Sequence, residues 1–233
     1  MIRGMLFDKD GTLFEFSASW DAWAAEVFAG LAEGDADRLS RIADAARFDL
    51  GASAFQPDSP VIAGTLAEVA ALLTPHVPQM SEAALADHLD QTAAGATMQE
   101  AVPLGPFLDG LRGRGISCGV ATNDSEAAAR AHLAAAGVED RLDFIAGYDS
   151  GHGGKPAPGQ CLAFLASRGF APGECAMVGD SLHDLMAGRA AGMQTVGVLT
   201  GLAPKSVLEP FADIVLPDIG HVFDWLDGVG SAH

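Results

Sequence analysis

The sequence predicts an α/β protein with a Rossmann-like parallel sheet core and an inserted all-α helical cap domain. Short apolar runs, each stopped by a polar or glycine-containing turn, alternate with helical segments over most of the chain. This alternation is typical of parallel βαβ units with helices on both faces of a sheet. Residues 16–99 interrupt it, because they form one predicted helix after another. We therefore predict a core of residues 1–15 and 100–233 and a helical insert of residues 16–99.

The predicted strands are short runs of apolar residues, as expected for buried strands. The first is Met5-Leu6-Phe7, which Asp8-Lys9-Asp10-Gly11 stops. An apolar run that ends in such a turn is typical of a buried strand. The later runs are Ile116–Ala121, Leu142–Ala146, Cys175–Val178, Thr195–Leu199 and Asp213–Leu216.

The predicted helices carry recognisable end signals. Ser125–Ala136 is rich in alanine and is followed by Gly137, a residue suited to a left-handed helix end. Gln160–Arg168 and Ser181–Ala191 are also followed by glycine, and Ser181 with Asp184 resembles a capping box. Within the insert we expect helices over Trp20–Leu31, Asp35–Phe48, Thr65–Leu73 and Ser81–Thr92.

Composition excludes several classes of function. The 233 residues include 13 Lys and Arg against 31 Asp and Glu, a formal charge of −18. Nucleic acids and anionic membranes attract basic surfaces, so we expect neither as a partner. No apolar stretch is long enough to span a bilayer, and Asp8 and Asp10 come too early for a secretory signal to precede them. Three cysteines without a C-x-x-C pair indicate reduced thiols and a cytoplasmic protein.

Polar side chains follow three of the predicted strands. Asp8 and Asp10 follow the first, Thr122 and Asn123 follow the second, and Asp180 follows the Cys175–Val178 run. Ligands bind outside the carboxyl ends of strands in open α/β sheets. Lys155 lies in a loop before a helix and is expected at the same place. One site would then hold several carboxylates, a hydroxyl and an ammonium group.

These side chains suit phosphoryl transfer. Neighbouring carboxylates repel one another and favour a cation, and hard oxygen ligands favour Mg²⁺ completed by a substrate phosphate. One carboxylate can attack phosphorus to form an aspartyl-phosphate, and a second can act as general acid and base. Lys155 and the Thr122 hydroxyl would stabilise the phosphoryl oxygens.

The motifs resemble those of haloacid-dehalogenase-like phosphatases. Asp8-Lys9-Asp10-Gly11-Thr12-Leu13 resembles their D-x-D-G-T-L signature. Three further motifs follow in the family's order, which are Thr122-Asn123, Lys155-Pro156-x-Pro158 and Gly179-Asp180-Ser181-x-x-Asp184. The helical insert is similar to the cap of the subgroup that contains phosphoglycolate phosphatases and β-phosphoglucomutases. The resemblance covers essentially the whole chain.

This resemblance implies a role for each matched residue. Asp8 would be the nucleophile and a metal ligand, and Asp10 the general acid and base, with its backbone carbonyl on the metal. Lys155 would steady Asp8 and the phosphate. Asp180 would be a direct Mg²⁺ ligand. Asp184 would orient a metal-bound water or bind the metal through that water. Thr122 would bind phosphate, aided by the Asn123 backbone N–H.

Other residues near the motifs have simpler interpretations. The family usually has an apolar residue where this chain has Lys9, and strand alternation predicts that its side chain points away from the nucleophile. We interpret His152 and His183 as solvated positions. Trp20 and Trp23 are expected to pack in the core or at the insert interface. Asp184 and Thr122 are also candidate helix caps.

The resemblance implies an Mg²⁺-dependent phosphatase of a small phosphorylated metabolite, with phosphoglycolate as the leading candidate. Asp10 and Asp180 argue against dehalogenation, and the absence of a lysine in the insert argues against phosphonate cleavage. A phosphosugar mutase or phosphotransferase, or a non-catalytic regulatory protein on the same scaffold, stays open. Candidate residues for recognising the leaving group of the substrate are Arg38, Arg41, Arg47 and residues 55–60. We expect a monomer or homodimer.

Overall fold

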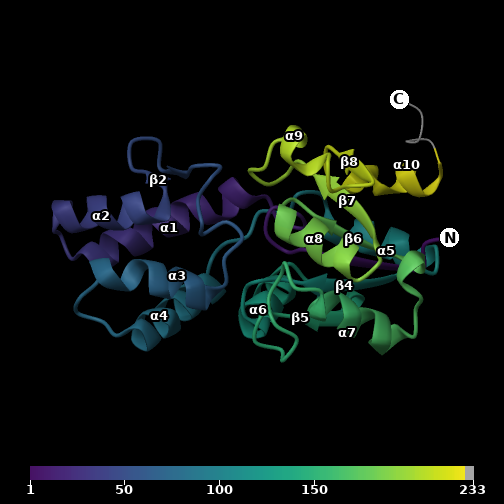
Figure 1. Ribbon diagram of the computed structural model, residues 1–233, viewed down its shortest axis with the longest axis horizontal. Coiled ribbons are helices and arrows are strands. Elements are labelled where there is room, and N and C mark those ends of the chain that lie inside the picture. Colours follow the sequence, from purple (N-terminus) through teal and green to yellow (C-terminus); the bar gives the residue numbers. More distant parts are fainter. Residues whose placement is uncertain (229–233) are drawn as a thin grey trace.

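A computed structural model describes residues 1–228, which form a parallel sheet unit and a helical unit side by side (Figure 1). The sheet has six strands in the order β5-β4-β1-β6-β7-β8, and all neighbouring pairs are parallel. The strands are β1 (Gly4–Phe7), β4 (Ser117–Ala121), β5 (Phe144–Ala146), β6 (Cys175–Gly179), β7 (Gln194–Val198) and β8 (Ile214–Leu216). All six strands match predicted runs, which confirms the α/β core.

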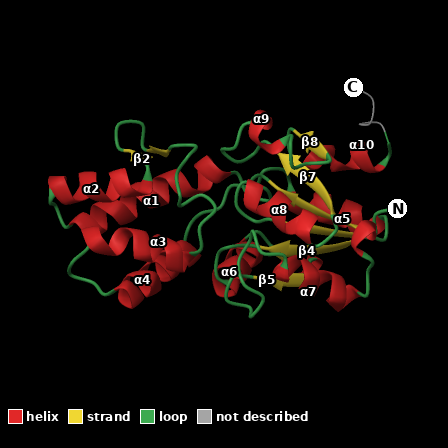
Figure 2. Cartoon of the chain, viewed as in Figure 1, coloured by secondary structure: helices red, strands yellow, loops and turns green. Residues whose placement is uncertain are grey.

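Helices cover both faces of the sheet (Figure 2). They are α5 (Leu104–Gly113), α6 (Glu126–Ala135), α7 (Gly159–Arg168), α8 (Leu182–Ala190), α9 (Lys205–Leu208) and α10 (Val222–Leu226). Alternating side chains of each strand enter opposite layers. Met5 and Phe7 of β1 pack with α5 and α10, while Leu6 packs with α7 and α8. The left-handed end expected after α6 is confirmed at Gly137, whose φ is 68°.

The helical unit lies between β1 and α5 in the sequence and has its own hydrophobic core. Its helices are α1 (Phe16–Ala32), α2 (Ala36–Ala46), α3 (Leu66–Leu73) and α4 (Glu82–Ala94). It also contains a short hairpin of β2 (Phe48–Asp49) and β3 (Ala54–Phe55), where the sequence predicted only helices and turns. The second helix ends two residues earlier than predicted, because Arg47 adopts a left-handed conformation with φ 53° after α2, and Phe48 begins β2 instead.

Two chain connections join the units, and they pair with each other. The Glu15 backbone N–H donates to the Gln99 carbonyl at 2.9 Å, and the Ala101 N–H donates to the Leu13 carbonyl at 2.9 Å. This pairing fixes the insert next to the carboxyl end of β1. Single-turn 3₁₀ helices occupy Thr74–His76, Glu139–Arg141, Pro172–Glu174 and Ile219–His221. Among residues 1–228, none of the helices combines the length and the apolar character needed to span a bilayer.

Candidate active site

The expected polar residues converge at the carboxyl edge of the sheet. Strands β4, β1 and β6 are neighbours, so the residues that follow them lie side by side. Asp8 follows β1, Thr122 follows β4 and Asp180 follows β6. All three line one cleft, together with Lys155 from the loop before α7. The cleft opens between the sheet edge and the helical insert, because insert residues form its other wall.

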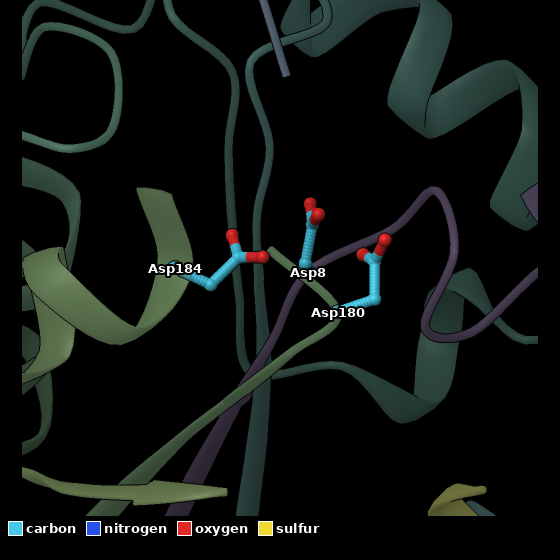
Figure 3. A group of neighbouring side chains, drawn as sticks. All are labelled: Asp8, Asp180 and Asp184. Atoms are coloured by element: carbon cyan, nitrogen blue, oxygen red, sulfur yellow. The ribbon is translucent and has the colours of Figure 1, made fainter. Parts of the chain in front are cut away.

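Three buried carboxylates form the floor of this cleft (Figure 3). One oxygen from each of Asp8, Asp180 and Asp184 lies within 4.8 Å of the other two. Lys155 Nζ lies 2.7 Å from Asp8 Oδ1 and 2.6 Å from Asp184 Oδ1. Asp184, in the first turn of α8, also accepts hydrogen bonds from the Ser181 backbone N–H and hydroxyl, at 3.0 and 2.7 Å. The Lys155 ammonium group therefore contacts two of the three carboxylates.

Burial and repulsion change the acidity of these groups. Burial and the negative charge of Asp184 raise the pKa of Asp8 to about 7, although Lys155 opposes the shift. The same causes, burial first, raise the pKa of Asp180 well above its usual value. Burial alone would lower the pKa of Lys155, but Asp184 and Asp8 raise it instead. The cluster thus has an excess of negative charge that a cation would relieve.

The donor set and the space around it fit a small divalent cation. Carboxylate oxygens are hard ligands, of the kind Mg²⁺ prefers. Two glycines make room for Asp180, because a Cβ added at Gly11 or Gly201 would lie 2.4 or 1.7 Å from Asp180 Oδ2. Asp8, Asp180 and Asp184 are the residues that would hold the ion. The side chain of Asp10 lies outside this cluster, so the ligand role expected for its backbone carbonyl stays a prediction.

Asp10 is held by two donors that meet at one oxygen atom. Lys9 Nζ donates to Asp10 Oδ1 at 2.7 Å, and Trp20 Nε1 donates to the same atom at 2.8 Å. Sequence reasoning missed both contacts. Lys9 Nζ contacts neither Asp8 nor Lys155 and instead contacts the Asp10 carboxylate. Trp20 is a hydrogen-bond donor as well as a packing residue. Trp20 lies on α1, so the insert contributes directly to the geometry of Asp10.

The Lys9 ammonium group is completely buried and has three partners. Besides Asp10, it lies 3.1 Å from His132 Nδ1 and 3.3 Å from Asp124 Oδ2. His132 Nε2 lies 2.8 Å from the Ala93 carbonyl, so Nε2 carries the proton and Nδ1 accepts from Lys9. Burial and Lys9 lower the pKa of His132 to about 4, which keeps the imidazole neutral. Burial would lower the pKa of Lys9, but Asp10 and Asp124 raise it.

Thr122 and Asn123 lie in the cleft where the sequence placed them. The Thr122 hydroxyl accepts from the Asp124 backbone N–H at 3.1 Å. Ser125, and not Thr122, caps α6. A buried glutamine that the sequence analysis did not single out, Gln160, donates to the Thr122 carbonyl at 2.9 Å. The Asn123 amide donates to the carbonyls of Ala63 and Lys155 at 2.8 and 2.9 Å, which ties an insert loop to the Lys155 loop.

The remaining candidates divide between the cleft and the surface. His183 lines the cleft, whereas His152 does not and lies beside the Phe144 ring. None of the three insert arginines lines the cleft. Arg38 pairs with Glu33, Arg47 pairs with Asp58, and Arg41 is exposed on α2. Of residues 55–60, only Phe55 contributes to the lining.

The three thiols, all within the part of the chain that the structure describes, are buried and free. Burial raises the pKa of Cys118 and Cys161 to about 12 and that of Cys175 to about 11. Since thiolates are the reactive form, these cysteines are packing residues.

Comparison with known proteins agrees with this geometry. Residues 2–192 match the haloacid dehalogenase-like hydrolases. The chain belongs to this family. A phosphoglycolate phosphatase of Rhodospirillum rubrum is 36% identical over 120 residues, 52% of this chain and 50% of the relative. The chain thus spans about half the length of the first curated relatives it matches. A phosphoglycolate phosphatase of Xylella fastidiosa is 31% identical over 202 residues, 85% of this chain and 81% of the relative.

A solved structure has the same fold as this chain. It is described as a predicted phosphoglycolate phosphatase from Haemophilus somnus and superposes with a TM-score of 0.72 at 16% identity. The superposition covers 97% of this chain and 98% of that chain. The likeness extends over both units, including the helical insert.

Proposed function

We propose that this protein is an Mg²⁺-dependent phosphatase that hydrolyses a small phosphorylated metabolite through an aspartyl-phosphate intermediate. The main observation in support of this proposal is the cluster of Asp8, Asp180 and Asp184 with Lys155 at the carboxyl edge of the sheet. A nucleophilic carboxylate, a cation site and a buried ammonium group in one cleft are what phosphoryl transfer requires. Family membership and the phosphatase names of the relatives support this proposal.

In the first half-reaction, an oxygen of Asp8 attacks phosphorus and the bond to the leaving oxygen breaks. Asp10 gives its proton to that oxygen, so the product leaves as an alcohol. Lys155 stabilises the charge on Asp8 and on the phosphoryl oxygens, and Thr122 donates its hydroxyl to phosphate. Mg²⁺ held by Asp8, Asp180 and Asp184 would supply further neutralisation of the phosphoryl charge.

In the second half-reaction, Asp10 accepts a proton from water and the water oxygen attacks phosphorus. The bond between the Asp8 oxygen and phosphorus breaks, which releases inorganic phosphate, restores the Asp8 carboxylate and leaves Asp10 protonated for the next cycle. Residues 16–99 act as a cap that limits water in the cleft and contacts the leaving group.

The buried free thiols support a cytoplasmic enzyme, and we propose that it works as a monomer or homodimer.

A phosphate-release screen over small phospho-acids, sugar phosphates and nucleotides, with Mg²⁺ and with chelator, tests the proposal. Release of phosphate only with Mg²⁺ is the expected result. Transfer of phosphate to a second sugar position would instead identify the mutase alternative, and no turnover of any compound would favour a regulatory protein. Phosphoglycolate belongs in the screen because the relatives' names favour it.

A further inference from the structure

The two walls of the cleft differ sharply in chemistry. The sheet side is polar and acidic, with five aspartates, which are Asp8, Asp10, Asp124, Asp180 and Asp184. The insert side consists entirely of apolar residues and one glycine. Its largest side chains are Phe16, Trp20, Trp23, Phe55, Ile62 and Leu66. From this contrast we infer that the substrate carries an uncharged, mainly apolar leaving group that packs against the insert wall. The inference rests on the proposed phosphatase function and specifies its substrate class.

The cationic groups near the cleft are already engaged. Lys155 Nζ lies within 2.7 Å of both Asp8 and Asp184, at the position where it would serve the phosphate. Lys9 is enclosed by Asp10, Asp124 and His132 and has no exposed surface. His183, on the sheet side, is the one imidazole among the residues that line the cleft.

The insert has no cation to add. Its arginines are Arg38, Arg41 and Arg47, all on or next to α2, and its histidines are His76 and His88. None of these five residues lines the cleft, and the insert has no lysine. Arg47 sits in a pair with Asp58 at 2.6 Å, with half of its side chain exposed to solvent. The hairpin β2–β3 and α1 pack beside α2, so closure of the insert would bring apolar residues, and not these guanidinium groups, to the substrate.

An anionic leaving group would therefore be poorly accommodated. A carboxylate loses its hydration when it packs against apolar side chains, and only a paired charge or several hydrogen bonds offset that loss. The Trp20 N–H is already bonded to Asp10. The Trp23 N–H is a single neutral donor, buried without a partner among residues 1–228. In contrast, an apolar leaving group gains free energy from the contact area that it buries.

Three phosphate esters of similar alcohols test this directly. Phosphoglycolate, its neutral amide and benzyl phosphate all release an alkyl alcohol, so their intrinsic reactivities are comparable. We expect kcat/KM with Mg²⁺ to rise in that order and to be roughly tenfold or more higher for benzyl phosphate than for phosphoglycolate, since only the latter buries an unpaired charge. A kcat/KM for phosphoglycolate equal to or above that of both neutral esters would overturn the inference.

A positive charge introduced into the wall should shift the preference toward phosphoglycolate. Ile62 lies in a partly exposed loop, so Ile62→Arg places a guanidinium group at the cleft without opening the insert core. This variant should raise the ratio of phosphoglycolate to benzyl phosphate kcat/KM by about tenfold or more. Leu50→Arg adds the same charge at an exposed position of the insert that does not line the cleft, and should leave the ratio unchanged. Equal ratios in the two variants would contradict the inference.

Hydrolysis of 4-nitrophenyl phosphate separates this inference from the proposed function. Its leaving group is so reactive that turnover reports the phosphoryl-transfer machinery more than the fit of the insert wall. If this ester is hydrolysed with Mg²⁺ and phosphoglycolate is preferred among the three alkyl esters, the inference of an apolar leaving group is wrong and the proposed phosphatase function still holds. If 4-nitrophenyl phosphate is not hydrolysed, both the proposed phosphatase function and the inference about its leaving group are contradicted.

Discussion

The carboxylate of Asp8 has a backbone donor and an ammonium donor on the same oxygen. Asp8 Oδ1 accepts from the Lys9 backbone N–H at 2.6 Å and lies 2.7 Å from Lys155 Nζ. These contacts fix the orientation of the carboxylate group, and they leave its second oxygen without a hydrogen-bond donor from residues 1–228. A fixed carboxylate with one free oxygen at a cation site is suited to attack phosphorus.

Asp8→Asn should abolish turnover and leave the fold intact. The amide keeps the shape of the side chain but lacks the attacking oxygen anion, so we expect kcat to fall by roughly 10³-fold or more. Phosphate release and thermal unfolding measured on the same sample check both expectations. Asp87→Asn, the same substitution at an exposed position of α4, is the matched control. Activity retained in the Asp8 variant would remove Asp8 from the nucleophile role.

Trp20→Phe should lower kcat by roughly tenfold with little change in KM, because it removes one of two donors that orient Asp10. Trp23→Phe is a close control, since Trp23 lines the same cleft and its N–H has no partner in the described chain. Both variants lose the same ring area. Steady-state kinetics with equal effects of the two substitutions on kcat would show that Trp20 acts by packing alone.

The contacts of single residues mark where sequence reasoning stops. Strand alternation predicted that Lys9 points away from the nucleophile, and its ammonium group contacts neither Asp8 nor Lys155. Alternation does not extend into the turn, however, so it could not show that Asp10 folds back toward the same ammonium group. The three-residue spacing of Trp20 and Trp23 places both on one side of a helix. It says nothing about which carboxylate that side meets, because Asp10 belongs to the other unit.

At the scale of elements, the sequence specified the six strands of the core, because each apolar run ends in a turn signal, and it specified the helices α6, α7 and α8, which glycines follow. The helices α5, α9 and α10 were not predicted. The sequence alone also brought Asp8, Thr122 and Asp180 together, since it predicted that the strands before them are parallel. The hairpin β2–β3 was missed because its strands have two residues each. The placement of Arg38, Arg41 and Arg47 was also beyond the sequence, since composition does not tell which face of α2 meets the cleft.

Asn123 joins three elements, and its replacement should loosen all three. Its side chain donates to Ala63 in the insert loop and to the Lys155 carbonyl, and it accepts from the Lys155 backbone N–H at 2.8 Å. Asn123→Ala should lower the free energy of unfolding by about 1–3 kcal/mol, because partly buried backbone groups lose their hydrogen-bond partners. It should also lower kcat/KM through movement of Lys155.

Asn123→Asp distinguishes hydrogen bonding from loss of volume at this position. The carboxylate keeps the acceptor for the Lys155 N–H but faces the carbonyl oxygens of Ala63 and Lys155 without a donor. We expect it to be at least as destabilising as Asn123→Ala in urea unfolding. An aspartate variant as stable as the natural protein would mean that the two donated hydrogen bonds contribute nothing to joining the insert to the sheet unit.

For the whole molecule, the cleft lies between two separately packed cores and concentrates the negative charge of an already acidic chain. The apolar cores supply the stability that this cluster opposes, since buried like charges repel each other. A ligand that binds only the folded state stabilises it in proportion to its occupancy. Thermal unfolding is therefore a test of the cation site that does not depend on finding the substrate.

Mg²⁺ should raise the melting temperature of the metal-free protein by about 5–10 °C at a concentration near one hundred times its Kd, the shift expected from linkage for a chain of this size. Asp180→Asn removes one carboxylate from the cluster, so the metal-free variant should be at least as stable as the metal-free natural protein. Its gain from Mg²⁺ should be smaller, because a ligand is lost. Asp87→Asn, at an exposed position of α4 that does not line the cleft, should keep the full gain. Calorimetric scans with chelator and with Mg²⁺ measure all of these quantities, and an undiminished gain in the Asp180 variant would exclude Asp180 as a ligand.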